Sequence, residues 1–92
     1  MSQSRFIILV LIWSGWCEAC KRLVSSVIKV VPSVLELKFK MLNFDINYRE
    51  LVKFGIRHLP ILILFRDNRP IGIKIGSLTV QTLCDWLTSK MS

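Results

Sequence analysis

Ninety-two residues, 52% hydrophobic and 21% charged, predict one globular domain spanning residues 1–92 and exclude a disordered chain. Thirteen Lys and Arg against six Asp and Glu give a formal net charge of +7, which favours acidic partners. The basic residues are spread along the chain without a basic stretch interleaved with aromatics, so nucleic acid is not the expected partner.

The first predicted element is the apolar run FIILVLIW at residues 6–13. It is too short for a membrane span, which takes about 20 residues. It also makes a poor signal peptide, because bulky Trp16 precedes Cys17 where cleavage would require a small residue. An unbroken Ile, Leu and Val run is typical of a strand buried in a parallel sheet. We therefore expect a central strand and a cytoplasmic protein without a membrane partner.

A helix and a second strand should follow this run. Apolar residues recur at helical spacing, which predicts one buried stripe, and Pro32 should end the helix. The stripe comprises Cys20, Leu23, Val24, Val27, Ile28 and Val31, and Ser26 is among the residues expected to face outward. Apolar residues then alternate with charged ones, which indicates a strand. These apolar residues are Leu35, Leu37, Phe39 and Met41.

The second half of the chain begins with a predicted short helix and a hairpin. Asn47 and Glu50 suit a capping box for the helix, and Gly55 should end it. Apolar strands follow at residues 61–65 and 71–75. The short turn RDNRP between them indicates an antiparallel hairpin.

Gly76 should end the sheet, and Thr79 can cap a last helix, so the element order is β-α-β-α-β-β-α. The first crossover implies a parallel pair of strands, and the hairpin adds an antiparallel edge. We expect an α/β fold, a four-stranded mixed sheet flanked by helices on both faces. Cys17 and Cys20 fall where the first strand ends and the first helix begins, and the chemistry of open α/β sheets gathers at such strand ends.

The stretch from Cys17 to Cys20 (CEAC) suits thiol–disulfide exchange. Cys17 should lie at a helix N-terminus, where the helix dipole favours an anion, so we expect a lowered thiol pKa and a nucleophilic role. Cys20, one turn later on the buried stripe, suits a resolving thiol. Lys21 adds positive charge nearby, whereas Glu18 opposes thiolate formation.

Two other uses of the cysteine pair are weaker. A zinc site needs about four ligands. Besides the pair the chain offers Cys84 and a lone His58, with no second closely spaced pair, so no metal is expected. A purely structural disulfide is disfavoured, because so short a loop removes little entropy from the unfolded chain.

The stretch WSGWCEACK resembles the thioredoxin signature of Trp, two residues, Trp and then Cys-x-x-Cys-Lys. The similarity continues through NFDIN, FGIRHLPILILF and IGSLTVQTLCDWL, in the family's order, and covers almost the whole chain from Ile7 onward. The resemblance implies the thioredoxin fold and an enzyme, a dithiol–disulfide oxidoreductase that reduces protein disulfides as a monomer. It implies no built-in cofactor, and electrons from a thioredoxin reductase or from glutathione.

The resemblance also implies a substrate-binding surface. Pro60 matches the family's cis-proline, and Leu59 before it would offer its backbone to the substrate chain. Trp13 and Trp16 match the family's surface aromatics, although core packing explains Trp13 almost as well. Gly76 matches the glycine at which substrate backbone approaches, and a helix-entry turn explains it equally.

The sequence departs from the family pattern in three respects. It begins at the strand with the dithiol, so we expect the usual first strand and helix to be missing, as in short thioredoxins and glutaredoxins of some phages and mobile elements. Glu18-Ala19 replaces the family's Gly-Pro, which should alter the redox potential. The family's buried Asp, a proton acceptor, aligns with Leu11, and its Lys neighbour aligns with Met41.

These departures set the expectations for activity. Without a buried carboxylate to deprotonate Cys20, exchange should be slow at neutral pH unless another base is recruited. His58 is one candidate base, although a half-exposed loop histidine is the simpler interpretation. Cys84 is expected to be a non-catalytic thiol. The alternative function is a binding module of this fold, with weak redox turnover, that docks on an acidic partner protein.

Overall fold

The computed structural model describes residues 7–34 and 36–91. Its elements are β1 (Ile7–Trp13), α1 (Glu18–Val30), the 3-10 turn η1 (Val31–Ser33), β2 (Leu37–Asn43), α2 (Tyr48–Lys53), β3 (Ile61–Arg66), β4 (Arg69–Ile75) and α3 (Val80–Met91). The predicted order of strands and helices is confirmed. Phe6 and Leu35, which the sequence places in the first two strands, lie outside the described residues.

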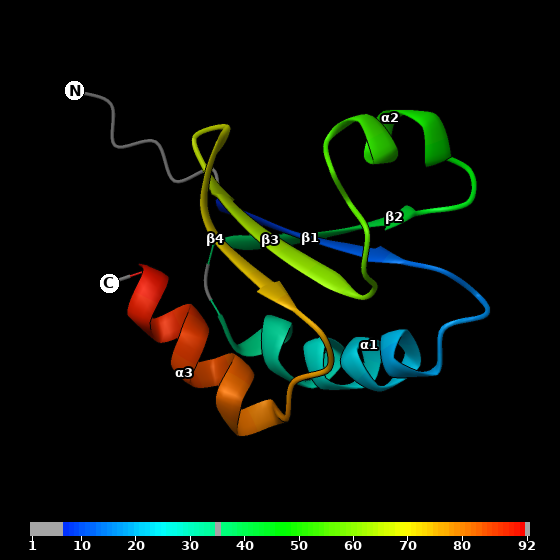
Figure 1. Cartoon of the computed structure of the whole chain (residues 1–92). Helices are drawn as coiled ribbons and strands as arrows, with labels where there is room; N and C mark the ends of the chain where they lie inside the picture. The colour runs from blue at the N-terminus through cyan, green and yellow to red at the C-terminus, as the bar shows by residue number, and fades with distance from the viewer. Residues whose placement is uncertain (1–6, 35, 92) are drawn as a thin grey trace.

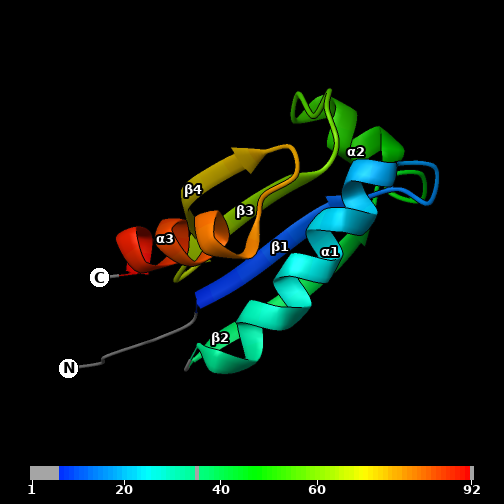
Figure 2. The ribbon, with the colours of Figure 1, turned by 90° about the horizontal axis from the view of Figure 1, so that it is seen from below.

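The four strands form one mixed sheet in the order β2-β1-β3-β4. β1 pairs in parallel with β2 and antiparallel with β3, and β3 pairs antiparallel with β4. Helices α1 and α3 lie against one face, and α2 lies on the other (Figures 1 and 2). The central position of β1 is the one that its unbroken apolar run predicts.

The larger core lies between the sheet and the helices α1 and α3. Alternate residues of β1 point to this side, where Leu9 and Leu11 pack against Leu23 and Val27 of α1. Each such buried side chain contributes about 1.5–3 kcal/mol. Gly72 of β4 lets α3 approach the sheet, because a Cβ there would lie 2.9 Å from the ring of Trp86.

The buried stripe of α1 is narrower than predicted. It consists of Cys20, Leu23, Val27 and Val30. Ile28 is 60% exposed, so its assignment to the stripe was wrong. Ser26, which was expected to face outward, is half-buried and donates a 2.9 Å hydrogen bond to the carbonyl oxygen of Leu78, in the loop before α3. The spacing of apolar residues predicts which face of a helix is buried, but it does not predict how wide a surface the neighbouring elements cover.

The capping box predicted for α2 does not form. Asn47 occupies the N-cap position, but its side chain makes no capping hydrogen bond. Its amide donates instead to the carbonyl oxygen of Asn43, at 2.9 Å. Gly55, with φ of +83°, follows the end of α2 as predicted. Thr79 caps α3 as predicted, accepting a 3.1 Å hydrogen bond from the backbone N–H of Thr82.

The hairpin turn is tighter than the predicted segment 66–70. Arg66 and Arg69 belong to the strands and pair with each other, so the loop consists of Asp67 and Asn68. Both have positive φ, 51° and 69°, as a two-residue turn of type I′ requires. Asp and Asn tolerate this region better than other residues with a side chain.

Candidate active site

The cysteine pair lies at the junction of β1 and α1. After β1 ends, the chain turns through Ser14, Gly15 and Trp16, and the backbone N–H of Cys17 donates to the carbonyl oxygen of Ser14 at 3.2 Å. Cys17 is the N-cap residue of α1, with an extended backbone. It therefore lies at the end of the helix where unpaired N–H groups favour negative charge.

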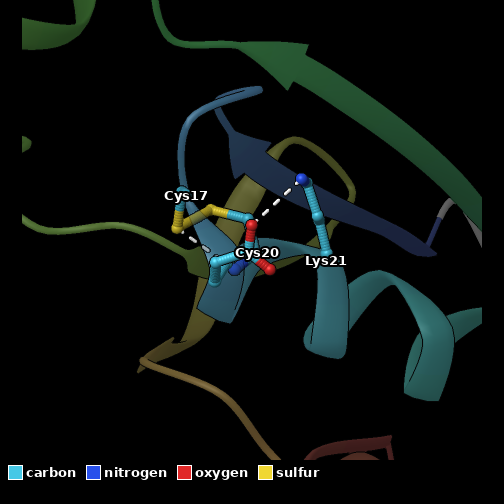
Figure 3. A network of polar contacts seen from close by, with 4 residues as sticks. Cys17, Cys20 and Lys21 are labelled. Atoms are coloured by element: carbon cyan, nitrogen blue, oxygen red, sulfur yellow. Dashed lines mark hydrogen bonds and ion pairs between the residues drawn. A yellow bond between two sulfur atoms is a disulfide. The ribbon is translucent and has the colours of Figure 1, made fainter.

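Cys17 and Cys20 form a disulfide across this first helical turn, with their Cα atoms 5.2 Å apart (Figure 3). The sulfur of Cys17 also accepts a hydrogen bond from the backbone N–H of Cys20, at 3.1 Å. Cys17 is 8% exposed and Cys20 is 1% exposed. The first cysteine is thus the more accessible of the two.

Glu18 and Lys21 flank the disulfide and bind each other. The Lys21 ammonium lies 3.1 Å from a carboxylate oxygen of Glu18, and both side chains are largely exposed (Figure 3). Such exposed pairs contribute about 0–1 kcal/mol. The pair therefore adds little to the stability of α1.

The structure adds Asp45 to the site, a residue that no sequence motif assigned to it. It lies just beyond β2, and the preceding residue continues the ladder, since the N–H of Phe44 donates to the carbonyl oxygen of Trp13 at 2.8 Å. Its carboxylate accepts hydrogen bonds from the indole of Trp16 at 3.2 Å and from the hydroxyl of buried Ser14 at 2.7 Å. The sequence feature that could have indicated Asp45 is the NFDIN stretch, where an acid closely follows the end of the strand that pairs with β1.

Pro60 lies at the same edge of the sheet. Ile61 pairs with Ile12 in the antiparallel β1–β3 ladder, which places Pro60 next to the end of β1. The Leu59–Pro60 peptide bond is cis, as predicted. The backbone N–H of Gly76 donates to the carbonyl oxygen of Pro60 at 2.9 Å. Gly76 has φ of +96°, a conformation that favours glycine.

The remaining predicted site residues differ in exposure. Trp16 is 68% exposed, whereas Trp13 is half-buried and packs against the larger core. Leu59 is half-buried. His58 is exposed in the loop before Pro60, more open than the half-exposed position expected for it.

A small hollow of about 260 Å³ lies behind the disulfide. Its lining consists of Trp13, Ser14, Gly15, Cys20, Lys21, Val24 and Met41. Leu11, which pairs with Met41 across the β1–β2 ladder, is fully buried beneath it. The lining holds no carboxylate, and this agrees with the alignment of Leu11 and Met41 to the charged positions of the family.

Within the described part of the chain, no three His, Cys, Asp or Glu side chains are grouped as a metal site would need. Cys84 is half-buried on α3 and borders a separate hollow with Val30 and Met91. Among the described residues, no helix has the length and apolar character to cross a membrane.

A disulfide at the N-terminus of a helix, at the same edge of the sheet as a cis-proline, is typical of proteins that carry out thiol–disulfide exchange. The thioredoxin family model matches residues 1–89. The chain belongs to the thioredoxin family and is a thiol–disulfide oxidoreductase.

Thioredoxins of several bacteria are similar to this chain. The thioredoxin of Rickettsia bellii is 31% identical over 91 residues, which span 97% of this chain and 86% of the relative. The thioredoxin of Pseudomonas aeruginosa is 33% identical over 86 residues, with coverage of 91% and 79%.

Solved structures share the fold at lower identity. Thioredoxin-2, described as a component of malaria parasite protein secretion machinery, superposes with a TM-score of 0.84 at 18% identity, covering 96% of this chain and 86% of its own. A second malarial protein gives a TM-score of 0.83 at 18% identity, with coverage of 94% and 98%. The architecture is therefore the thioredoxin fold.

Proposed function

We propose that this protein reduces disulfide bonds in other proteins, with Cys17 as the nucleophile and Cys20 as the resolving thiol. The Cys17 thiolate attacks one sulfur of the substrate disulfide, and the other sulfur leaves as a thiolate that takes up a proton. The Cys20 thiolate then attacks the Cys17 sulfur in the mixed disulfide and releases the second substrate thiol. Two electrons pass to the substrate, and the Cys17–Cys20 disulfide remains.

The position of the two sulfur atoms supports this assignment of roles. Cys17 is the more exposed cysteine and caps α1, so the helix dipole should lower the pKa of its reduced thiol. The N–H of Cys20 already points to the Cys17 sulfur and would stabilise a thiolate there. Cys20, at 1% exposure, is shielded from a protein substrate but lies within reach of the Cys17 sulfur.

Substrate docking is assigned to the surface around the disulfide. Trp16 offers an exposed ring, and Leu59 would pair its backbone with the substrate chain beside Pro60. Gly76 supports the same loop through its hydrogen bond to Pro60. We assign Trp13 a contact with substrate together with its packing against the core.

Three polar side chains are proposed to modulate the reaction. Glu18 and Lys21 set the charge at the mouth of the site through their ion pair. His58, exposed in the loop before Pro60, is the candidate for a base that replaces the missing carboxylate. Without such a base the resolving step should be slow at neutral pH.

The proposed setting is the cytoplasm, where thiols are kept reduced. We expect the 92-residue chain to act as a monomeric single domain in redox homeostasis and electron transport. Its oxidised pair would be reduced again by a thioredoxin reductase or by glutathione.

Insulin reduction with dithiothreitol tests the proposal. Wild type and the Cys84→Ser control should accelerate the reduction, and Cys17→Ser should not. Cys20→Ser should trap a mixed disulfide with insulin, because attack occurs but resolution does not. A wild type no faster than Cys17→Ser would refute the proposed activity.

A second function is a binding module of the same fold with weak redox turnover, docked on an acidic partner protein. The apolar pair Leu11 and Met41 behind the disulfide favours it, since the hollow there offers no proton acceptor. Insulin reduction by wild type at the rate of Cys17→Ser would support this function instead.

A further inference from the structure

The sheet face opposite α1 and α3 is only partly covered. Helix α2 spans six residues and lies over one end of the sheet, and no other helix of the described residues covers the rest of this face (Figure 1). Between α2 and the hairpin lies an apolar hollow of about 440 Å³, here called the α2 groove. Its lining consists of Val10, Ile12, Leu42, Leu51, Phe54, Ile56, Ile63, Phe65, Pro70 and Ile73.

Several large apolar side chains of the α2 groove are open to solvent. Phe54 on the α2 side is 81% exposed, and Ile73 on the β4 side is 59% exposed. Ile75, with the same exposure, extends the apolar surface along β4. Single exposed apolar residues are ordinary, but a contiguous hollow of them marks an interaction surface.

The charged side chains of β2 on the groove side of the sheet are basic. Lys38 pairs with Ile8 and Lys40 pairs with Val10 in the parallel ladder, so both lysines point to the groove side of the sheet. Both are exposed, and in the described part of the chain no ion pair involves either one. Among the described strand residues that face this side, none is acidic.

We propose that the α2 groove binds an amphipathic helix of a partner protein, one whose apolar stripe is flanked by Asp and Glu. An apolar sheet face is most commonly buried by a helix, and a helix about 10 Å across fits a trough with α2 as one wall. Leu or Ile side chains at helical spacing would enter between Phe54 and Ile73. Carboxylates on the flank of that helix would meet Lys38 and Lys40.

Two other occupants fit less well. A second copy of the chain would bring Lys38 and Lys40 of both molecules to one symmetric interface, and each copy carries a net charge of +7. An anionic membrane is also attracted to lysines. It presents a flat surface, however, whereas the apolar residues here line a hollow beside α2.

The test uses fluorescein-labelled synthetic helices of about 14 residues, with Leu at positions i, i+3, i+4 and i+7 and either Glu or Lys on the flanks. Fluorescence anisotropy should show that oxidised wild type binds the Glu peptide about tenfold more tightly than the Lys peptide at low salt. Lys38→Glu/Lys40→Glu should reverse this preference. Ile73→Glu should weaken binding of the Glu peptide about tenfold.

Ile28→Glu is the matched control, because Ile28 on α1 is 60% exposed on the opposite side of the sheet. It should bind the Glu peptide as wild type does. Insulin reduction should be unchanged in all these variants, which separates failure of docking from failure of the redox site.

Three results would overturn the proposal. Equal binding of the two peptides by wild type would remove the basis for an acidic partner. A wild-type dimer in sedimentation equilibrium that Ile73→Glu dissociates would identify a second copy as the occupant. Binding to vesicles of phosphatidylcholine and phosphatidylserine that Ile73→Glu abolishes would identify a membrane.

Discussion

The indole nitrogen of Trp16 donates to one carboxylate oxygen of Asp45 at 3.2 Å, and Ser14 donates to the other at 2.7 Å. One acid beyond β2 thus holds two parts of the turn that leads from β1 to Cys17. The exposed ring of Trp16 is oriented beside the disulfide by a residue 29 positions away in the sequence.

Replacing Asp45 by Ala should destabilise the protein and free the Trp16 ring. Ser14 is fully buried, and leaving its hydroxyl without an acceptor costs about 1–3 kcal/mol. Urea denaturation measures this loss, and the NMR signal of the Trp16 indole N–H should shift. The control is Asp85→Ala, which removes a surface acceptor of Gln81 and should change stability by less than about 0.5 kcal/mol. Equal losses in the two variants would contradict the role of Asp45.

The thiol of Cys17 should remain reactive at a lower pH than the thiol of a free cysteine. Its place at the N-cap of α1 favours the thiolate, so the folded pKa should fall below the value of about 8.5 for a free cysteine. A lowered pKa means that the thiolate persists as the pH decreases. Alkylation by iodoacetamide, followed in Cys20→Ser/Cys84→Ser, should therefore have its midpoint below that of N-acetylcysteine. A midpoint at or above that of the free thiol would contradict the prediction.

Charged residues at positions 11 and 41, behind the disulfide, should lower the stability of the protein and raise its rate of disulfide reduction. Leu11→Asp places a carboxylate at a fully buried position and should cost about 3–5 kcal/mol. Met41 lies directly opposite on β2 and is 42% exposed, so adding Met41→Lys should recover part of the loss. The double variant should also reduce insulin faster near neutral pH, because the introduced carboxylate can accept the proton of Cys20.

The control that lacks only the carboxylate is Leu11→Asn/Met41→Lys, which should not gain rate. Urea denaturation compares the stabilities. A double variant no more stable than Leu11→Asp would show that the two positions do not interact. An unchanged rate would show that another group, such as His58, already supplies the base.

Gly76→Ala should lower the free energy of unfolding, whereas Gly15→Ala should leave it nearly unchanged. Gly76 has positive φ, a conformation that costs a residue with a Cβ about 1–2 kcal/mol. Apart from Gly15 itself and its two chain neighbours, no described residue has an atom within 4 Å of a Cβ built at Gly15, and the backbone of Gly15 lies outside the positive-φ region. If the backbone of residue 76 leaves positive φ, its N–H no longer points to the Pro60 carbonyl oxygen, so Gly76→Ala should also raise the KM for insulin. Equal unfolding free energies for the two variants would contradict this explanation.

The fold could be predicted where buried positions appear in the sequence as a regular pattern of apolar residues. β1 lies between two strands, and its apolar run carries that information. Ile28 was misassigned because the width of the surface covered by α3 and its loop is a tertiary property. The side chain of Asn47 donates a hydrogen bond to the carbonyl oxygen of Asn43 instead of capping α2. Asn side chains can form either interaction, so the residue type alone does not predict which one forms.

The site was predictable where its parts are adjacent in sequence. Cys17 and Cys20 face each other because one helical turn separates them. The hydrogen bond from Trp16 to Asp45 depends instead on the parallel register of β1 and β2. No local pattern reports that register, so Asp45 was recognised only in the folded chain.

The hydrogen bond from Arg66 to the carbonyl oxygen of Met91, at 3.1 Å, joins the last residue of α3 to the end of β3. Arg66 pairs with Ile7, so α3 ends near the start of β1, whereas the disulfide follows the far end of that strand (Figure 1). The seven residues of β1, at about 3.3 Å each, set the separation. A linker fused beyond α3 can thus anchor the molecule to a sensor chip with its reactive edge turned toward the solution.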